Sequence, residues 1–465
     1  MMRLIVLVVL PLFASAAAAQ VTTFDRLTIS ETRLLRSTLH YQVGWLAPHV
    51  SGSESGVSMQ YYSDFPWTDI QLRAFDPWGR PTLPPTFVAT AARGFPTPSL
   101  ARLADRHLVT WCDEHPGCIP RAVVTDLGGV ALTPVIELGD EFKGGFKNIV
   151  TDGSRIGMTF AGGADNCSKC AILFQEHDLL GAPLFPPIEV ATPPPFPSGT
   201  IVFNSTAGFL PDGSVGVLYN QGNHGTIRYD IRYRRILPDQ TLTDPIVLPL
   251  MSDTRGYFAR FLSDGTWLIS WSSYPDSSIR FVRRFSPMGE PLGTPVQVDP
   301  NGIPKIASDG RFVHIWERNG NTEIRLKMYE ADGSVATDWF DPTPITPNRP
   351  SHAFPVDYGP YLSSTLEPGF RFAMTWFAMP VNQQVIDVHW TTIRPLIPGD
   401  LNADGVLNNF DIDAFVLAVV DRSLHSAAHP DIPPEVVDLL GDMNDDGVLN
   451  NFDIDPFVEA ILGSP

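Results

Sequence analysis

Residues 264–271 read DGTWLISW, an Asp-Gly turn followed by an alternating apolar run that ends in an aromatic residue. Seven alternating apolar runs that end in an aromatic residue occur along the chain, often after an Asp-Gly turn, and the intervals between their aromatic residues range from 45 to 66 residues. Alternating apolar residues bounded by Gly, Asp and Pro turns are typical of antiparallel strands and hairpins. The seven copies are YQVGW (Tyr41–Trp45), LVTW (Leu108–Trp111), GMTF (Gly157–Phe160), GVLY (Gly216–Tyr219), LISW (Leu268–Trp271), VHIW (Val313–Trp316) and AMTW (Ala373–Trp376).

Each copy is followed by a second apolar strand, and residues 20–395 show no sustained 3.6-residue apolar period. Repeats of this length predict a mainly β domain, a β-propeller with seven blades. A strand near Phe24–Ile29 is expected to pair with Val385–Thr392 and close the ring, which removes exposed sheet edges. A pair of β-sandwiches is the alternative, but a sandwich does not predict a sevenfold aromatic period. The recurring aromatic residue is expected to pack between neighbouring sheets.

Residues 1–19 have the composition of a signal peptide. Arg3 precedes the apolar run Leu4–Phe13, and alanine-rich triplets that fit a cleavage site follow it. The apolar run is too short to span a bilayer comfortably. We therefore expect a secreted protein whose mature form has no transmembrane segment.

The chain has four cysteines, Cys112, Cys118, Cys167 and Cys170. Outside the cytoplasm they are expected to form disulfides, and three pairings are open. We favour pairing of sequence neighbours. A four-thiolate zinc site is the alternative, although Cys112 and Cys118 are spaced too widely for a zinc knuckle.

The repeat region has no complete catalytic motif. The sialidase box, the Gly-x-Ser-x-Gly elbow and the His-Glu-x-x-His pair are all missing. Acidic doublets at Asp113–Glu114 and Asp140–Glu141 are the candidates for glycoside hydrolysis, but acidic pairs in loops are usually solvated. Four histidines lack ligand spacing and are interpreted as satisfied structural residues: His107, His115, His177 and His314. We assign no catalytic residue. The propeller is expected to bind a glycan or a protein, and a polysaccharide-degrading enzyme is the alternative.

A duplication lies near the C-terminus. Residues 399–416 read GDLNADGVLNNFDIDAFV and residues 441–458 read GDMNDDGVLNNFDIDPFV, so fifteen of eighteen positions are identical. Each copy has the ligand spacing of a twelve-residue calcium loop, with glycine at position 6 for the sharp turn. All-oxygen ligands favour calcium over zinc, and two ions are expected. The predicted ligands are Asp400, Asn402, Asp404, Val406, Asn408 and Asp411 in the first loop, and Asp442, Asn444, Asp446, Val448, Asn450 and Asp453 in the second.

A helix is expected to follow each loop, beginning at about Asp411 in the first copy. Pro456 falls in the first turn of the second helix, where a missing N–H costs little. The segment Pro433–Leu440 is expected to add a short helix. The predicted apolar faces are Ile412, Phe415, Val416 and Val419 in the first helix, and Ile454, Phe457, Val458 and Ile461 in the second.

The duplicated loop–helix unit resembles type I dockerins over about residues 398–463, and aspartate in place of glutamate at position 12 matches that pattern. It is similar to dockerin-like tails of secreted bacterial proteins. The resemblance implies calcium-dependent docking to a cohesin-like partner through loop positions 10 and 11, which are Asn409, Phe410, Asn451 and Phe452. Those positions are often small and polar in cellulosomal dockerins, so burial of both phenylalanines in the core is the alternative. The near-identical copies imply two binding orientations.

Acidic residues concentrate in the same region. Residues 396–465 contain fourteen acidic residues and one basic residue, so they carry −13 of the net charge of −19. This charge argues against nucleic acid as a partner, because phosphate binding needs a basic surface. We expect a signal peptide (1–19), a β-propeller-like domain (20–395), a linker at Arg394–Pro398 and a dockerin-like domain (396–465). The function expected is that of an extracellular or cell-surface protein held on a cohesin-like or other surface scaffold. A tail that sorts or anchors the chain without a cohesin is a further possibility.

Overall fold

The computed structural model describes most of the chain between residues 21 and 463. The segments outside the description are 1–20, 25–26, 31–32, 40–42, 52–53, 65–66, 76–83, 85, 92–98, 104–105, 115–117, 139–145, 163–170, 193–199, 224–228, 251–253, 274–278, 300–302, 308, 319–322, 341–360, 363–371, 379–384, 405, 431 and 464–465. The predicted signal peptide, Cys167, Cys170, His115 and the doublet Asp140–Glu141 lie in these segments.

The described part of residues 21–395 is built from antiparallel sheets. The first four-stranded sheet contains β4 (Val43–Ser51), β5 (Glu54–Asp64), β6 (Trp67–Phe75) and β7 (Thr86–Ala91). The second contains β8 (Ser99–Leu103), β9 (Arg106–Glu114), β10 (Cys118–Asp126) and β11 (Ile136–Glu137). The third contains β12 (Phe146–Thr151), β13 (Arg155–Gly162), β14 (Ala171–Asp178) and β15 (Ile188–Ala191). An eight-stranded sheet contains β16 (Thr200–Phe209), β17 (Val215–Asn223), β18 (Tyr229–Ile236), β19 (Ile246–Val247), β20 (Thr254–Phe261), β21 (Trp267–Ser273), β22 (Arg280–Phe285) and β23 (Pro291–Val298).

Two further sheets follow. One contains β24 (Ile303–Ile306), β25 (Phe312–Arg318), β26 (Glu323–Tyr329) and β27 (Val335–Phe340). The other joins the two ends of the β region and contains β1 (Val21–Phe24), β2 (Leu27–Ser30), β3 (Arg33–Leu39), β28 (Tyr361–Leu362), β29 (Phe372–Ala378) and β30 (Val385–Pro395).

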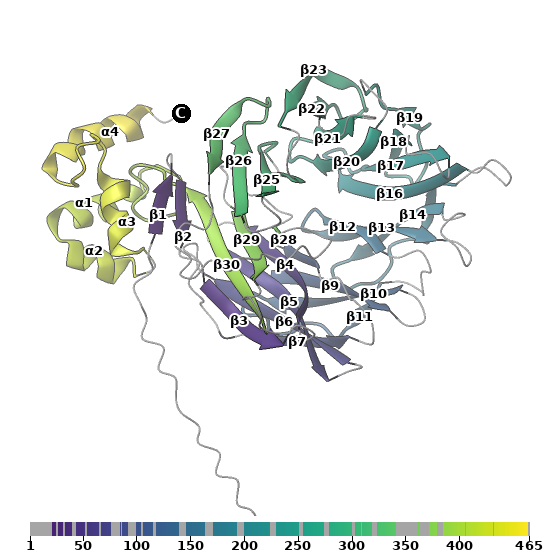
Figure 1. Ribbon diagram of the computed structural model, residues 1–465, viewed down its shortest axis with the longest axis horizontal. Helices are drawn as coiled ribbons and strands as arrows, with labels where there is room; N and C mark the ends of the chain where they lie inside the picture. The colour runs from purple at the N-terminus through teal and green to yellow at the C-terminus, as the bar shows by residue number, and fades with distance from the viewer. Residues whose placement is uncertain are drawn as a thin grey trace, which may run out of the picture.

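One strand of each sheet, and two of the eight-stranded sheet, lie side by side in a series. β4 contacts β8, β8 contacts β12, and the series continues through β16 and β20, which share the eight-stranded sheet, to β24, while β28 contacts β4. The sheets therefore radiate from a shared centre, as Figure 1 shows. This arrangement is a β-propeller, and the predicted mainly β fold is confirmed.

N-terminal strands complete the last sheet. β3 pairs with β30 from Arg33 opposite Trp390 to Leu39 opposite Val385, while β2 reaches only the end of β30, with Leu27 opposite Pro395. Closure by an N-terminal strand is confirmed. The strand predicted for this role, Phe24–Ile29, is wrong, because residues 33–39 supply most of the pairing. β30 also runs to Pro395, so it includes the start of the predicted linker.

The Asp-Gly turns close the hairpins in the way that their sequence requires. In the turn between β20 and β21, the Leu262 N–H donates to the Thr266 carbonyl at 2.8 Å and the Gly265 N–H donates to the Leu262 carbonyl at 3.0 Å. Gly265 has φ +81°, a conformation that favours glycine. The Asp264 carboxylate accepts the Thr266 N–H at 3.0 Å, and Arg284 pairs with the same carboxylate. Backbone hydrogen bonds and the Asp264 carboxylate together stabilise the turn.

Four of the seven recurring aromatic residues lie in the core, as expected; the side chains of Trp45, Trp316 and Trp376 lie outside the described part of the chain. Trp111, Phe160 and Tyr219 are buried on the second strands of their sheets, and Trp271 is buried on β21 of the eight-stranded sheet. Beside them Trp267 stacks on Phe285 with ring centroids 4.4 Å apart. These side chains fill the space between neighbouring sheets.

The first predicted copy of the repeat is not equivalent to the others. Its described residues, from Val43 to Trp45, belong to β4, which is the first strand of its sheet. The second strand is β5, which contains Ser58-Met59-Gln60-Tyr61. An alternating run that ends in an aromatic residue occurs in both strands, so the pattern alone selects the wrong one.

Residues beyond β30 form a helical unit, drawn in yellow in Figure 1. Its helices are α1 (Asp411–Val420), α2 (Arg422–Ala428), α3 (Pro434–Gly441), the 3₁₀ turn η3 (Asn451–Asp453) and α4 (Ile454–Gly463). The helix predicted at Asp411 and the short intervening helix are confirmed. α2 was not expected; its N-cap is Asp421, whose carboxylate accepts the N–H groups of Ser423 and Leu424. No helix that the structure describes has the length and apolar content needed to cross a bilayer.

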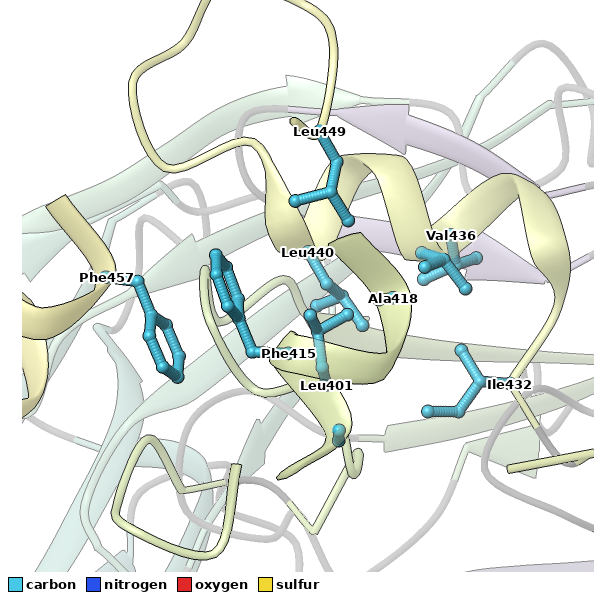
Figure 2. Close-up of a cluster of buried hydrophobic side chains, with 10 residues drawn as sticks. Leu401, Phe415, Ala418, Ile432, Val436, Leu440, Leu449 and Phe457 are labelled. Carbon is cyan, nitrogen blue, oxygen red and sulfur yellow. The ribbon is translucent and has the colours of Figure 1, made fainter. Parts of the chain in front are cut away.

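The helical unit has its own small core (Figure 2). Phe415 of α1 stacks on Phe457 of α4 with ring centroids 3.9 Å apart and an interplanar angle of 8°. These two residues occupy the same position in the two copies of the duplication. The side chains around them are Leu401, Ala414, Ala418, Ile432, Val436, Val437, Leu440 and Leu449. The two loop–helix copies therefore meet face to face across a shared core.

Candidate metal centre

The two predicted loops, residues 400–411 and 442–453, fold in nearly the same way. Position 4 is left-handed in both, with φ +57° at Ala403 and φ +59° at Asp445. Gly447 at position 6 has φ +88°, as the sharp turn requires, while its counterpart Gly405 lies outside the described residues. The sequence identity of the copies is therefore matched by the backbone.

Carboxylates at position 12 close both loops from the inside. Asp411 is fully buried and accepts the N–H groups of Asn402 at 3.2 Å and Asn408 at 2.9 Å. Asp453 is equally buried and accepts the N–H groups of Asn444 at 3.1 Å and Asn450 at 2.8 Å. In each copy one carboxylate therefore ties the start of the loop to its end.

Shorter side chains shape the turn between those ends. Oδ1 of Asn402 accepts the Asp404 N–H at 2.8 Å, and Oδ1 of Asp404 accepts the Val406 N–H at 2.9 Å. Asn408 then accepts the Phe410 N–H at 2.7 Å. The second loop repeats the three bonds at 2.8–2.9 Å, with Asn444, Asp446 and Asn450 as acceptors. Each acceptor oxygen keeps a second lone pair, so these bonds leave the oxygens able to bind a cation.

Positions 1 and 7 complete the predicted ligand set. Asp400 is only 1% exposed. Asp442 is more open and accepts the Asp446 and Gly447 N–H groups at 3.0 and 2.7 Å. The Val448 carbonyl accepts from the Asn450 amide at 2.9 Å, and the Val406 carbonyl does the same with Asn408 at 3.3 Å.

The donor types fit calcium, because every predicted ligand atom is a carboxylate, amide or carbonyl oxygen. Burial raises the pKa of Asp411, and the neighbouring Asp404 charge adds to the rise, although the backbone hydrogen bonds oppose it. A cation beside these two carboxylates would relieve that cost. Within the described residues, however, no three His, Cys, Asp or Glu side chains are grouped closely enough to hold a metal alone. Binding would therefore depend on the asparagine and carbonyl oxygens as well.

The residues predicted to contact a partner are on the surface. Phe410 is 74% exposed and Phe452 is 72% exposed, and Asn409 and Asn451 beside them are exposed too. The structure contradicts the alternative that the phenylalanines form the core. That role belongs to Phe415 and to its counterpart in the second copy.

The predicted apolar helix faces divide into two parts. Phe415 and Phe457 are buried, and Val419 and Ile461 pack against the core in part. Ile412, Val416, Ile454 and Val458 are exposed instead, so only part of each predicted apolar face contributes to the core. Ala414 and Ala418 of α1 are buried as well, so α1 is apolar on more than one side.

His425 of α2 is a buried titratable residue of the helical unit. Its Nε2 lies 3.0 Å from the Leu401 carbonyl, and its Nδ1 is buried without a partner. Burial lowers the pKa of His425; the hydrogen bond to Leu401 opposes this effect, while His429 and Arg422 add to it.

In the unfolded chain His425 binds a proton below about pH 6.5, whereas burial disfavours the protonated form in the folded unit. The stability of the folded unit is therefore expected to fall as pH drops through about 6.5. Thermal melting of the helical signal from about pH 7.5 to about pH 5.5 tests this expectation. H425Q is expected to reduce the dependence of the melting temperature on pH. H429Q is expected to weaken it only in part, because this variant removes a smaller contribution and leaves His425 buried.

The candidate site residues in the propeller are the acidic doublet, the cysteines and the histidines. Asp113 and Glu114 lie at the end of β9, and Cys112 stands opposite Pro120 while Cys118 stands opposite Glu114. His107, His177 and His314 are buried. Nδ1 of His177 is satisfied by the Gly181 carbonyl at 3.1 Å, whereas neither ring nitrogen of His314 has a hydrogen-bond partner. The expectation that every histidine is satisfied is therefore wrong at His314.

Comparisons with known proteins find similar folds at low identity. A protein of unknown function from Dyadobacter fermentans is 11% identical over 78% of this chain and 99% of its own, with a TM-score of 0.41. The β-propeller domain of the Trilobed protease from Pyrococcus furiosus gives 11% identity, 75% and 96% coverage and a TM-score of 0.45. An α-L-arabinanase from Penicillium chrysogenum is 11% identical over 68% of this chain and 100% of its own, with a TM-score of 0.39. No family model and no curated protein matches the chain. The dockerin resemblance therefore rests on the loop and helix residues themselves.

Proposed function

We propose that this chain is a secreted, non-catalytic protein whose C-terminal unit, loaded with two calcium ions, docks it onto a cohesin-like or other cell-surface partner. The propeller serves as its binding domain. The observation that carries the proposal is a pair of matching exposed apolar faces on the helical unit. The first face consists of Val406, Phe410, Ile412, Val416 and Val420; the second consists of Val448, Phe452, Ile454, Val458 and Leu462.

Every member of the first face has its counterpart 42 residues later in the second. Ile412, Val416 and Val420 are spaced four residues apart, so they lie along one side of α1. Apolar side chains exposed together in this way are typical of interaction surfaces. Two equivalent faces support docking in either of two orientations.

The charges around the faces indicate the chemistry of the partner. Asp413, Asp455 and Glu459 are exposed on the same two helices. A complementary surface would be apolar at its centre and basic at its rim. The ring-bearing residues Phe410 and Phe452 are suited to act as anchors, because aromatic side chains dominate binding energy at interfaces.

Calcium would act on this surface through the loops. Phe410 and Phe452 lie two residues after the ligands at position 9, Asn408 and Asn450, whose side chains accept their N–H groups. An ion that orders the loop also orders the anchor beside it. Docking is therefore expected to require calcium.

Seven blades are part of the proposal. The eight-stranded sheet is joined at a single pair, Tyr229 opposite Thr254, so it divides into two sets of four. β28, β29 and β30 with β3 make a further set of four. A closed ring of this kind would give the propeller a rigid surface to bind a glycan or a protein.

The docking proposal is tested by capturing surface and extracellular proteins of the source cells on the intact chain, with calcium and with EDTA. The wild type is expected to retain one partner in calcium only. F410A and F452A are each expected to keep it, because one intact face remains, whereas the double variant loses it.

L424A is the matched control. Leu424 is an apolar residue, 54% exposed on α2, outside both faces. The variant is expected to bind as the wild type does. Undiminished capture by the F410A/F452A double variant, or capture that ignores EDTA, would show that the duplicated faces are not the docking surface.

A further inference from the structure

Three polar side chains replace apolar ones at one interface between sheets of the propeller. Ser270 of β21, Arg280 of β22 and His314 of β25 face the space between strands β20–β23 and strands β24–β27. Their placement follows from alternation along the strands, since Leu268, Val282 and Phe312 each lie two residues away and pack together in that interface.

The same positions are apolar at the preceding interface. By strand register, Ser270 corresponds to Leu218, Arg280 to Ile231 and His314 to Ile269. Leu218, Ile231 and Ile269 belong to a single buried cluster. One interface earlier, Ile172 and Val217 occupy the positions of Arg280 and His314, while the buried Thr159 occupies the position of Ser270. The packing of these sheets therefore requires no polar group at the positions of Arg280 and His314.

The polar atoms at this interface lack partners. Ser270 and His314 are fully buried, and the Ser270 hydroxyl and both His314 ring nitrogens make no hydrogen bond. Nε and Nη1 of Arg280 are buried without an acceptor as well. Such groups cost free energy unless something pairs with them.

Arg280 also lacks a counter-charge. Arg235, Arg284 and Arg311 each pair with a carboxylate, whereas Arg280 forms no ion pair with any described residue. Its one aromatic contact is with Phe258, whose ring centroid lies 5.7 Å from the guanidinium carbon. Phe258 is 41% exposed on β20, so the cluster reaches the surface at this point.

His314 stays neutral. Burial lowers the pKa of His314 to about 3; the Arg280 charge adds to the shift, whereas the charge and the backbone of Asp299 oppose it. A neutral imidazole offers one N–H donor and one acceptor nitrogen. Lys327, opposite His314 on β26, lies 3.7 Å from Asp338, and Asp299 holds the Trp339 indole at 3.1 Å. Asp299 keeps its negative charge, because an indole N–H does not neutralise a carboxylate. Arg280 is therefore the cation of this cluster that pairs with no carboxylate among the described residues.

We propose that Ser270, Arg280 and His314 bind a carboxylate that enters past Phe258. Its two oxygens would accept hydrogens from Arg280, from the Ser270 hydroxyl and from the His314 N–H. One negative charge balances one guanidinium, which favours a monoanionic carboxylate over a phosphate dianion. This deepens the proposed binding role of the propeller, because acidic sugars and acidic peptides both carry such a group.

The test is calorimetric titration of the intact protein with glucuronate, glucose, N-acetylglutamate and inorganic phosphate. Binding of glucuronate without glucose is expected if the source is an acidic sugar, and binding of N-acetylglutamate if it is an acidic peptide. Phosphate is expected to bind more weakly than the carboxylate. Binding of phosphate alone, or of none of the four compounds at about ten millimolar, would overturn the proposal. Neither result would bear on calcium-dependent docking, which is tested separately.

R280I introduces the residue that stands at the equivalent position in β14 and β18. It is expected to weaken carboxylate binding roughly ten- to hundredfold, as expected when a charge-assisted hydrogen bond is lost. Its melting temperature is expected to equal or exceed that of the wild type, because an unpaired buried charge is removed.

R283M is the control. Arg283 lies on the same strand but faces the other way, where it donates to the Gly293 carbonyl at 3.0 Å. This variant is expected to bind the carboxylate as the wild type does. A lower melting temperature for R280I together with unchanged binding would mean that Arg280 only supports the sheet packing.

Discussion

Replacing Trp267 by alanine is expected to lower the free energy of unfolding of the propeller by about 3–5 kcal/mol. The Trp267 side chain is fully buried between two sets of strands. Its ring stacks on Phe285 at 4.4 Å, and it contacts Tyr233 and Phe261 at centroid distances of 5.2 and 6.1 Å. Truncation removes all three contacts and leaves a cavity that rigid β-strands cannot fill. The loss is measured by denaturant unfolding of the wild type and W267A.

F87A provides the comparison for that loss. Phe87 lies on β7 and is 55% exposed, so its truncation leaves no internal cavity. Its effect is expected to stay within about 0.5 kcal/mol. Equal stabilities for W267A and F87A would mean that the packing between sheets does not hold the propeller together.

Removing calcium with EDTA is expected to open the helical unit while the sheets stay folded. The unit is small, and its core consists of the Phe415–Phe457 stack and its neighbours. Each predicted loop contains three aspartate ligands, and burial already raises the pKa of Asp411. Calcium at a hundred times its dissociation constant would add roughly 2.7 kcal/mol per site.

Amide hydrogen exchange of the intact protein tests this expectation. Segments from α1 to α4 are expected to lose protection in EDTA and to regain it when calcium is restored. The strands β20–β23 serve as the internal control and are expected to exchange at the same rate throughout. Unchanged protection of the helices in EDTA would show that the loops fold without an ion.

Much of the architecture could be predicted from spacing. The aromatic period located the second strands of the later sheets, because an alternating run between two turns has few other solutions. It failed at Tyr41–Trp45, where a first strand has the same pattern as a second. The closing strand was also misplaced, since alternation does not reveal which N-terminal segment pairs with β30.

In the helical unit, the loop residues were predictable because calcium loops demand fixed positions. The helix faces were not, because Ile412, Phe415 and Val416 are equally apolar in sequence, and only the packing of two copies decides which is buried. The cluster of Ser270, Arg280 and His314 could not be predicted from the sequence, because strand register across two sheets brings its members together.

The most direct test of the account is the number of calcium ions that the intact protein binds, measured by equilibrium dialysis against calcium. Two ions per chain are expected. The count is expected to fall to one in D453A, which removes the buried carboxylate that closes the second loop. No bound calcium in the wild type, or a count that D453A leaves unchanged, would contradict the assignment of the duplicated loops as calcium sites.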